Sequence, residues 1–190
     1  ILGCGGFEWD PELRRLLNGR VEGTMSPPSN RGDGLRIAME AGALTGRTDE
    51  AWWCPVISPP GRTLEGNRVF RLSSQERGLP GTIMINRYGE RFVNEAMNYN
   101  DVGRQMALTD PRDYRRGRPN SAAWLMFDSI VRQSYRLAGL AASDPDPDWL
   151  VRGETVAALA DRIDVPRERL QHDARHLQRD GSRGRRRALR

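Results

Sequence analysis

Apolar residues occur along the chain in short runs, separated by segments rich in Gly, Pro and Arg. The run TIMI at 82–85 predicts a buried strand, followed by a turn at 86–89 and a return strand at 91–93. A second run, AWLMFD at 123–128, predicts another buried strand. Ile1 and Leu2, followed at once by glycines, predict the end of a further buried strand at the start of the chain.

Apolar residues at helical spacing predict four helices. The first has Asp10 as its N-cap and Pro11 at its first helical position, and runs to Leu17. The others are expected at 35–43, 128–138 and 154–163. Residues 52–76 predict irregular chain with short strands, and SDPDPDW at 143–149 predicts a loop between the last two helices.

Composition narrows the class of protein. No segment approaches the roughly 18 consecutive apolar residues of a membrane span, so we expect no membrane partner. Cys4 and Cys54 are too few for a disulfide framework, and neither has metal-ligand spacing. We therefore expect no metal site and two reduced cysteines in a cytoplasmic protein.

The net charge of +5 lies entirely in the last segment. Residues 172–190 hold seven Arg and two Asp, and the rest of the chain is neutral. A neutral body disfavours nucleic-acid binding as the general function of the chain. The basic tail alone keeps that alternative open, although it has no aromatic residues among its arginines.

The first candidate motif is GCGGF, which directly follows the predicted N-terminal strand. Gly5 and Gly6, with Phe7 after them, permit a close backbone approach to a neighbour. A tight turn between a strand and a helix would use the same glycines, so the motif alone leaves both interpretations open.

The second candidate motif is NRGDG, immediately before a predicted helix. Gly32 and Gly34 flank Asp33 where the free N–H groups and the positive end of the helix dipole face outward. A phosphate or an electron-rich ring edge fits such a position. Asp33 as a simple helix cap is the alternative.

Taken in order, these motifs resemble a known family. A strand ending in Gly-Gly-Phe, then x-G-D-G leading into a helix that ends E-A-G-A, then the hairpin N-x-x-G-x-R-F-x-N-E, is similar to the FAD-dependent fumarate reductase/succinate dehydrogenase-like flavoproteins. The stretch GERFVNEAMNYNDVGRQM is most similar to the 3-ketosteroid 1-dehydrogenase branch. The resemblance covers about residues 1–171.

The resemblance implies an α+β chain that holds FAD. It implies part of a Rossmann-like FAD domain at 1–50 and a substrate-capping, catalytic domain at 51–171. The implied cofactor-binding residues are Gly5, Gly6, Phe7, Gly32, Asp33 and Gly34. Because the family's GxGxxG turn and its second FAD segment are missing, we expect a fragment from the middle of a flavoenzyme, inactive alone.

The implied reaction is dehydrogenation of a carbon-carbon bond next to a ketone, with hydride transfer to N5 of the flavin. The substrate would be a small apolar ketone or a steroid-like molecule, and an electron acceptor would reoxidise the flavin. Tyr99 matches the branch's catalytic tyrosine, although a phenol is a weak base unless a neighbour assists it. Arg91 and Glu95 match the family hairpin, where they either act on the substrate or form an ion pair between the strand and the next helix.

Three further features bear on alternatives. Fumarate reductases carry a proton-delivering Arg three residues after the hairpin Glu, and here that position is Asn98, which disfavours fumarate reduction. Trp52 and Trp53 either form a wall of an apolar pocket or pack as a pair in the core. An interaction module without catalytic activity, with a nucleic-acid-contacting tail, is the competing class of function.

The tail at 172–190 departs from the family pattern. It lacks the Phe-Asn helix and the Gly-x-Asp expected there. GC-rich codons for this segment, read one nucleotide out of frame, can give a sequence close to that continuation. We interpret the tail as a frameshift product, and a genuine basic arm is the alternative.

Overall fold

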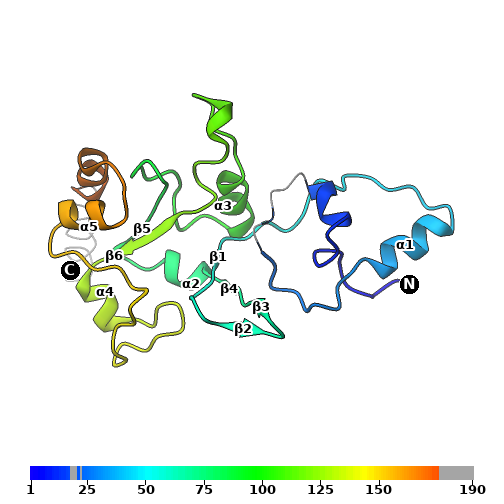
Figure 1. Ribbon diagram of the computed structural model, residues 1–190, viewed down its shortest axis with the longest axis horizontal. Coiled ribbons are helices and arrows are strands. Elements are labelled where there is room, and N and C mark those ends of the chain that lie inside the picture. The colour runs from blue at the N-terminus through cyan, green and yellow to red at the C-terminus, as the bar shows by residue number, and fades with distance from the viewer. Residues whose placement is uncertain (18–20, 22, 176–190) are drawn as a thin grey trace, which may run out of the picture. The chain divides into compact units, whose positions relative to one another are not determined.

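A computed structural model describes residues 1–17, 21 and 23–175 of the chain. Within it the chain forms two compact units (Figure 1). Unit 1 comprises Ile1–Trp52 and Gly61–Arg71, and unit 2 comprises Trp53–Pro60 and Leu72–Arg190. The predicted basic tail lies, from residue 176 on, outside the described residues.

Unit 1 has little regular structure, and most of it is loop. Its elements are the 3-10 helix η1 (Leu13–Leu17), helix α1 (Asp33–Glu40) and the short antiparallel pair β2 (Thr63–Leu64) and β3 (Asn67–Arg68). Strand β4 (Arg71–Leu72) lies at the boundary of the units.

The predicted N-terminal strand is wrong for this structure. Ile1 and Leu2 are not in a strand, and both side chains are exposed. A strand needs a neighbour for its backbone N–H and C=O groups, and the described residues provide none for this segment.

The predicted helices of unit 1 are confirmed, with shifted ends. Asp10 Oδ1 accepts hydrogen bonds from the amides of Glu12 and Leu13, so Asp10 caps the first turn, but the helix is a 3-10 helix that begins at Leu13. Helix α1 ends earlier than predicted, because Gly42 adopts the left-handed conformation at φ 84°.

Unit 2 contains most of the helices and strands. These are β1 (Val56–Ile57), α2 (Ser74–Arg77), β5 (Thr82–Ile85), α3 (Tyr99–Met106), η2 (Tyr114–Arg116), β6 (Trp124–Phe127), α4 (Ser129–Ser134), α5 (Val156–Arg162) and a helical segment at 167–175.

The core of unit 2 forms around the antiparallel ribbon of β5 and β6, with α5 beside it (Figure 1). All four residues of β5 are buried, and the register pairs Ile83 with Met126. Ile83 and Ile85 pack with buried apolar residues from the C-terminal helices and the turn that joins them, namely Ala160, Ile163, Val165 and Leu170. These contacts exclude water from one face of the ribbon and provide most of its stabilisation.

The predicted hairpin partner of β5 is wrong. After the turn, the return segment forms only a single bridge, between Ile85 and Arg91, and the strand that pairs with β5 is β6. In a longer hairpin the Met84 amide would bond to residue 92, but here it donates to Glu95 Oε1 at 2.8 Å. A side chain therefore takes the place of the next backbone hydrogen bond.

The two predicted C-terminal helices are confirmed but shorter. Asp128 caps α4 by accepting a hydrogen bond from the Val131 amide, and α4 ends before a tight turn in which Ala138 and Gly139 have positive φ. Helix α3 was not predicted. Its N-cap is Asn98, whose Oδ1 accepts a hydrogen bond from the Asp101 amide at 3.0 Å.

The loop predicted at 143–149 is confirmed, and one buried arginine holds the chain around it. Arg132 donates from Nε to Asp146, from Nη1 to the Ala141 carbonyl and from Nη2 to the Asp144 carbonyl, at 2.7, 2.8 and 2.7 Å respectively. One guanidinium thus anchors the loop to α4.

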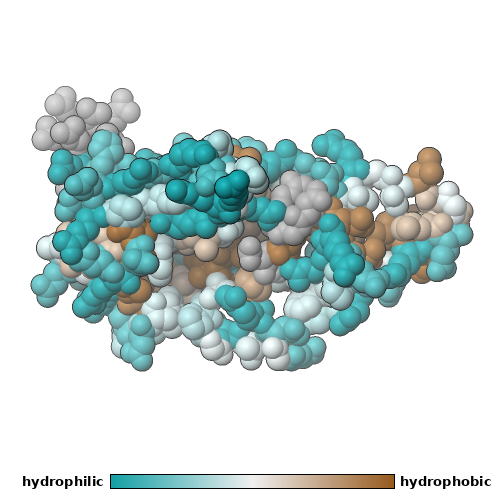
Figure 2. Space-filling view, turned by 45° about the horizontal axis from the view of Figure 1, so that its top comes forward, coloured by the Kyte–Doolittle hydropathy of each residue, from teal (hydrophilic) through white to brown (hydrophobic). Residues whose placement is uncertain are grey.

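Large apolar side chains are exposed in unit 1, around the N-terminal segment and α1 (Figure 2). They include Ile1, Leu2, Ile37, Met39 and Leu44. Grouped apolar surface of this kind is typical of a contact surface.

Among the described residues no helix has the length and apolar character to cross a membrane, and no three His, Cys, Asp or Glu side chains gather at a metal-binding distance.

The turn after β5 is anchored by a buried aspartate. The Asp110 carboxylate accepts a hydrogen bond from the Tyr88 hydroxyl at 2.7 Å and from the Arg112 amide at 2.9 Å. These two bonds, with the Arg112 guanidinium, lower the pKa of Asp110 to about 2. The turn and the loop at 110–118 are therefore held together through an ionised carboxylate.

Replacing Asp110 with Asn should lower the stability of the chain at neutral pH. Because the folded-state pKa lies below the ordinary value of 3.8, the carboxylate contributes its full stabilisation above that value and loses it as the pH falls through about 2. Urea unfolding over a pH series should show the difference between wild type and Asp110→Asn shrinking in that window. Asp148→Asn, at an exposed position, is the control and should show no such convergence.

Candidate functional site

The two segments predicted to hold the cofactor lie side by side in unit 1. The Gly32 amide donates to the Gly6 carbonyl at 3.0 Å, and the Trp9 amide donates to the Asn30 carbonyl at 3.1 Å. Motifs separated by about 25 residues in sequence are thus joined by backbone hydrogen bonds. The indole of Trp9 adds a bond to the Ser26 carbonyl at 2.8 Å, which fixes the intervening loop.

Two of these glycines are required by backbone conformation and by space. Gly5 and Gly32 have φ of 80° and 86°, in the left-handed region. A Cβ on Gly5 would lie 2.3 Å from Asn30 Oδ1, and one on Gly32 would lie 2.3 Å from Leu13 Cδ1. The close contact between the two segments therefore depends on the absence of side chains at both positions.

Helix α1 begins directly at the second motif. Gly32 is the N-cap residue, Gly34 is buried, and the exposed Asp33 is the first helical residue. No side-chain cap is formed, so the alternative in which Asp33 caps the helix is not what the structure shows. The amides of the first turn have no partner within the helix and carry its positive end.

Glu8, which sequence reasoning did not single out, lies next to these motifs. Its Oε2 is buried without a hydrogen-bond partner among the described residues, and a Cβ on Gly6 would lie 2.5 Å from it. An unpaired buried acceptor is unfavourable unless a donor is supplied from elsewhere. A hydroxyl donor would satisfy this oxygen, and a phosphate fits the amides at the start of α1. FAD carries both kinds of group.

In unit 2 the structure brings Arg91 and Glu95 together as an ion pair. Arg91 Nη2 lies 2.6 Å from Glu95 Oε2, and Arg91 Nε lies 3.0 Å from Oε1. Glu95 is buried and also accepts the Met84 amide. Both carboxylate oxygens are therefore occupied, and this is the ion-pair geometry weighed above.

A second arginine, Arg77, contacts the same residue. Its Nη1 donates to the Glu95 carbonyl, while its Nε is buried and has no hydrogen-bond partner among the described residues. Burial lowers the pKa of Arg77, and the Glu95 carboxylate opposes that shift. Two guanidiniums thus contact Glu95, Arg91 through its carboxylate and Arg77 through its carbonyl.

Tyr99 is the first residue of α3, and its side chain is 42% exposed. In the described part of the chain its hydroxyl has no hydrogen-bond partner, so it contacts neither Arg91 nor Glu95 through a hydrogen bond. The start of α3 is fixed by Asn100, whose Oδ1 accepts the Trp53 amide at 3.0 Å.

Gly103 fixes the same helix from one turn further along. A Cβ at Gly103 would lie 2.7 Å from the Trp53 carbonyl carbon and 2.9 Å from the Cys54 amide nitrogen. The backbone of α3 therefore lies directly on the 53–54 segment. The spacing Tyr-x-x-x-Gly is the sequence signal for this contact, because it puts Tyr99 and Gly103 one helical turn apart.

Trp52 and Trp53 do not act as a pair. Trp53 is buried at 7% exposure in unit 2, whereas Trp52 is 88% exposed in unit 1. The prediction of a core pair is therefore wrong, whereas the prediction of a pocket wall stays a prediction. Consecutive residues in extended chain point to opposite sides, which accounts for the difference.

Comparison with known proteins gives a direct assignment of family. Residues 1–185 match the family described as "FAD binding domain". The chain therefore belongs to this family, and FAD, the cofactor expected from the sequence, is confirmed as the cofactor that defines it.

Individual relatives agree with the resemblance found in the sequence. The chain is 42% identical over 172 residues to 4-oxocyclohexanecarboxylate 2-dehydrogenase of Sinomonas cyclohexanicum, covering 90% of this chain. It is 35% identical over 179 residues to 3-oxosteroid 1-dehydrogenase of Mycobacterium tuberculosis (strain ATCC 25618 / H37Rv), again covering 90% of this chain.

A solved structure is also similar. The crystal structure of 3-ketosteroid delta1-dehydrogenase from Sterolibacterium denitrificans, in complex with 1,4-androstadiene-3,17-dione, matches 90% of this chain with a TM-score of 0.72 and 34% identity. The chain spans 29% and 31% of the lengths of the two curated relatives, and 31% of the solved chain. The expected mixed α and β fold is thus confirmed at the level of class, and its division into domains remains a prediction.

Replacing Glu95 with Gln should destabilise unit 2 by about 1–3 kcal/mol, because an amide cannot balance the charge of Arg91 or accept all of its hydrogen bonds. Urea denaturation followed by circular dichroism measures this. Glu168→Gln, at an exposed position, is the control and should change stability by less than about 0.5 kcal/mol. Wild-type stability in Glu95→Gln would contradict a structural role for the pair and leave proton transfer as the function of Glu95.

Proposed function

We propose that this chain is a segment of an FAD-dependent dehydrogenase that introduces a double bond next to a ring ketone. The observation that carries the proposal is the agreement of two independent comparisons. Both the most similar sequence given above and the solved structure are dehydrogenases whose substrates or ligands contain an oxo group on a ring. A cyclic ketone is therefore the substrate class that these relatives share.

In this proposal the segments around Gly5–Phe7 and Gly32–Gly34 belong to the FAD-binding part at 1–50. Their mutual hydrogen bonds, the unpaired amides at the start of α1 and the buried Glu8 oxygen support it. FAD, when bound, supplies the acceptor for the hydride. Residues 51–171 form the substrate part, and the break between the compact units near residue 52 supports this division, although residues 61–71 group with unit 1.

We assign to Tyr99 the transfer of the proton from the carbon next to the ketone. Its side chain is partly exposed and its hydroxyl is not engaged by another described residue, so the position is open to a substrate. Asn100 and Gly103 fix the helix that carries it, and fixed geometry is what a proton-transferring group requires. Arg91 and Glu95 are assigned a positioning role, because the ion pair occupies both carboxylate oxygens.

Fumarate reduction is disfavoured by Asn98. This residue occupies the position expected of the proton-delivering arginine, and its side chain caps α3. An amide that accepts a backbone hydrogen bond does not donate a proton to a substrate at neutral pH.

A separate electron acceptor and a cytoplasmic location complete the proposal, and two free cysteines are consistent with a reducing compartment.

A chimaera tests the function. The 172 aligned residues of 4-oxocyclohexanecarboxylate 2-dehydrogenase would be replaced by the matching residues of this chain. The chimaera should retain bound flavin, seen as visible absorbance, and oxidise the parent enzyme's ketone with a dye as electron acceptor. Absence of bound flavin would contradict the cofactor assignment, and bound flavin without oxidation of any ring ketone would contradict the reaction.

Within the chimaera, Tyr99→Phe should slow flavin reduction by about 10² to 10⁴-fold, since only the proton-transferring oxygen is removed. Single-turnover stopped flow measures the rate, and substrate binding should change far less. Tyr135→Phe is the matched control, because its side chain has a similar exposure of 39%. A loss below about tenfold in Tyr99→Phe would make Tyr99 a structural residue.

A further inference from the structure

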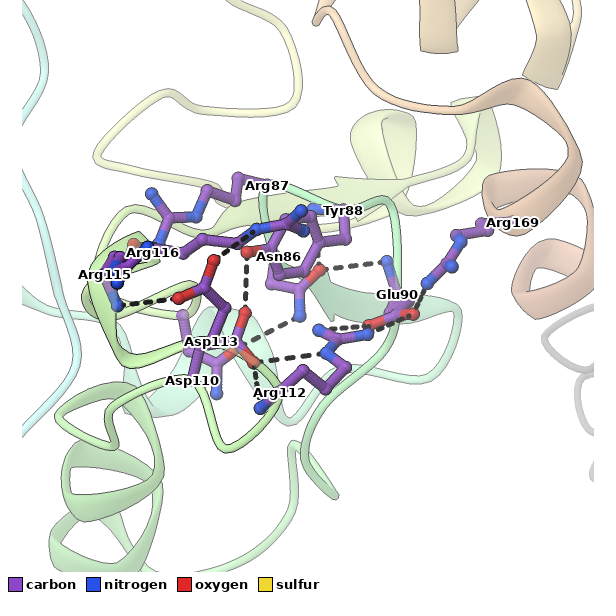
Figure 3. Close-up of polar contacts among 11 residues, drawn as sticks. Asn86, Arg87, Tyr88, Glu90, Asp110, Arg112, Asp113, Arg115, Arg116 and Arg169 are labelled. Carbon is purple, nitrogen blue, oxygen red and sulfur yellow. Dashed lines mark hydrogen bonds and ion pairs between the residues drawn. The ribbon is translucent and has the colours of Figure 1, made fainter.

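An arginine-rich surface surrounds the turn after β5, apart from all the residues assigned above. It consists of Arg87, Tyr88, Arg112, Tyr114, Arg115 and Arg116, and we call it the arginine–tyrosine surface. Figure 3 labels these residues except Tyr114. Three guanidiniums lie around one ring. The distances from the Tyr88 centroid are 4.6 Å for Arg112, 5.5 Å for Arg87 and 6.0 Å for Arg116.

Acidic side chains hold Arg112 in place. Arg112 pairs with Asp110 at 3.2 Å and with Glu90 at 3.3 Å, and Glu90 also pairs with Arg169. The Asp110 side chain is fully buried and its low pKa keeps it ionised, so its charge balances Arg112 without facing the solvent.

The outer arginines are held by the loop itself. Arg116 Nε lies 3.5 Å from Asp113, and Arg87 Nη2 donates to the Arg116 carbonyl. Arg115 lies over the exposed ring of Tyr114, 5.8 Å from its centroid. Side chains ordered in this way lose less conformational entropy when they bind a partner.

The surface carries an excess of positive charge. Five arginines, counting Arg169, face three carboxylates, which leaves a net charge of +2. Within the described residues, Arg87 and Arg115 have no carboxylate at ion-pairing distance, so these two side chains account for the excess. Since the sequence outside the tail is neutral, this concentration of charge is local.

We propose that the arginine–tyrosine surface binds an acidic peptide segment of a partner protein, whose carboxylates pair with Arg87 and Arg115. The guanidinium fork matches a carboxylate, and the exposed tyrosine ring offers apolar contact between the charges. A nucleic acid fits less well. The Glu90 and Asp113 side chains remain 30% and 41% exposed between the arginines and would repel a continuous phosphate backbone.

The test is an NMR titration of the full chain, labelled with ¹⁵N, with an unlabelled synthetic peptide. In this peptide glutamates alternate with glycines. The readout must be local, because residues 172–190 hold seven further arginines that attract any polyanion. Peptide titration at about 10 mM salt, where the Debye length is about 30 Å, should shift the amide resonances of 87–88 and 112–117. The shifts should weaken at about 0.15 M salt.

Arg87→Gln/Arg115→Gln should reduce the affinity read from these resonances by about tenfold, because it removes the two unpaired charges. Arg136→Gln/Arg175→Gln is the matched control, since it removes the same charge from exposed positions elsewhere in unit 2 and should change the affinity less than about twofold. Three results would each overturn the proposal: no local shifts with the peptide, an equal loss in the control, or tighter local binding of a single-stranded oligonucleotide of equal charge.

Discussion

The buried Glu95 carboxylate is the interaction on which unit 2 depends most. It accepts the amide of Met84 in β5 and the guanidinium of Arg91 after the turn, while its own carbonyl accepts Arg77 of α2. Three segments thus converge on one residue. Removing a single partner from such a site leaves a buried group unpaired, which costs far more than an exposed ion pair contributes.

The same interaction explains why the strands could be predicted but their pairing could not. The apolar run at 82–85 and the run at 123–128 each predict a buried strand. All of β5 is buried, whereas in β6 Trp124 is exposed and the other three residues are half-buried. Pairing depends instead on competition for the backbone amides. A local turn favours residues 91–93 as a partner, but Glu95 takes the Met84 amide that this pairing would use, and β6 is the strand that pairs with β5. The apolar pattern of the sequence does not show which group binds the Met84 amide.

For the candidate site, the sequence motifs identified the candidate residues but not the contacts that hold them in place. The two glycine motifs are adjacent in the structure, and Arg91 and Glu95 do interact. Asn100, Gly103 and Glu8 were missed, since their significance lies in contacts with distant backbone or in an unpaired oxygen. Helix α3 itself was missed because it spans only Tyr99–Met106 and is mostly polar, so its N-cap, Asn98, was the main available signal.

The exclusive use of arginine gives these separate findings a common physical basis. The sequence contains no lysine, and the longest strands of the described chain have four residues, so backbone pairing alone joins few segments. A guanidinium has five donors in a rigid fork and can bond to several acceptors at once. Arg132 joins a carboxylate and two carbonyls of one loop, and Arg112 joins Asp110 to Glu90. An ammonium has its donors on one nitrogen, whereas a guanidinium spreads them over three nitrogens and so reaches acceptors in different segments. Arginine thus has in these loops the linking role that sheet hydrogen bonds have elsewhere.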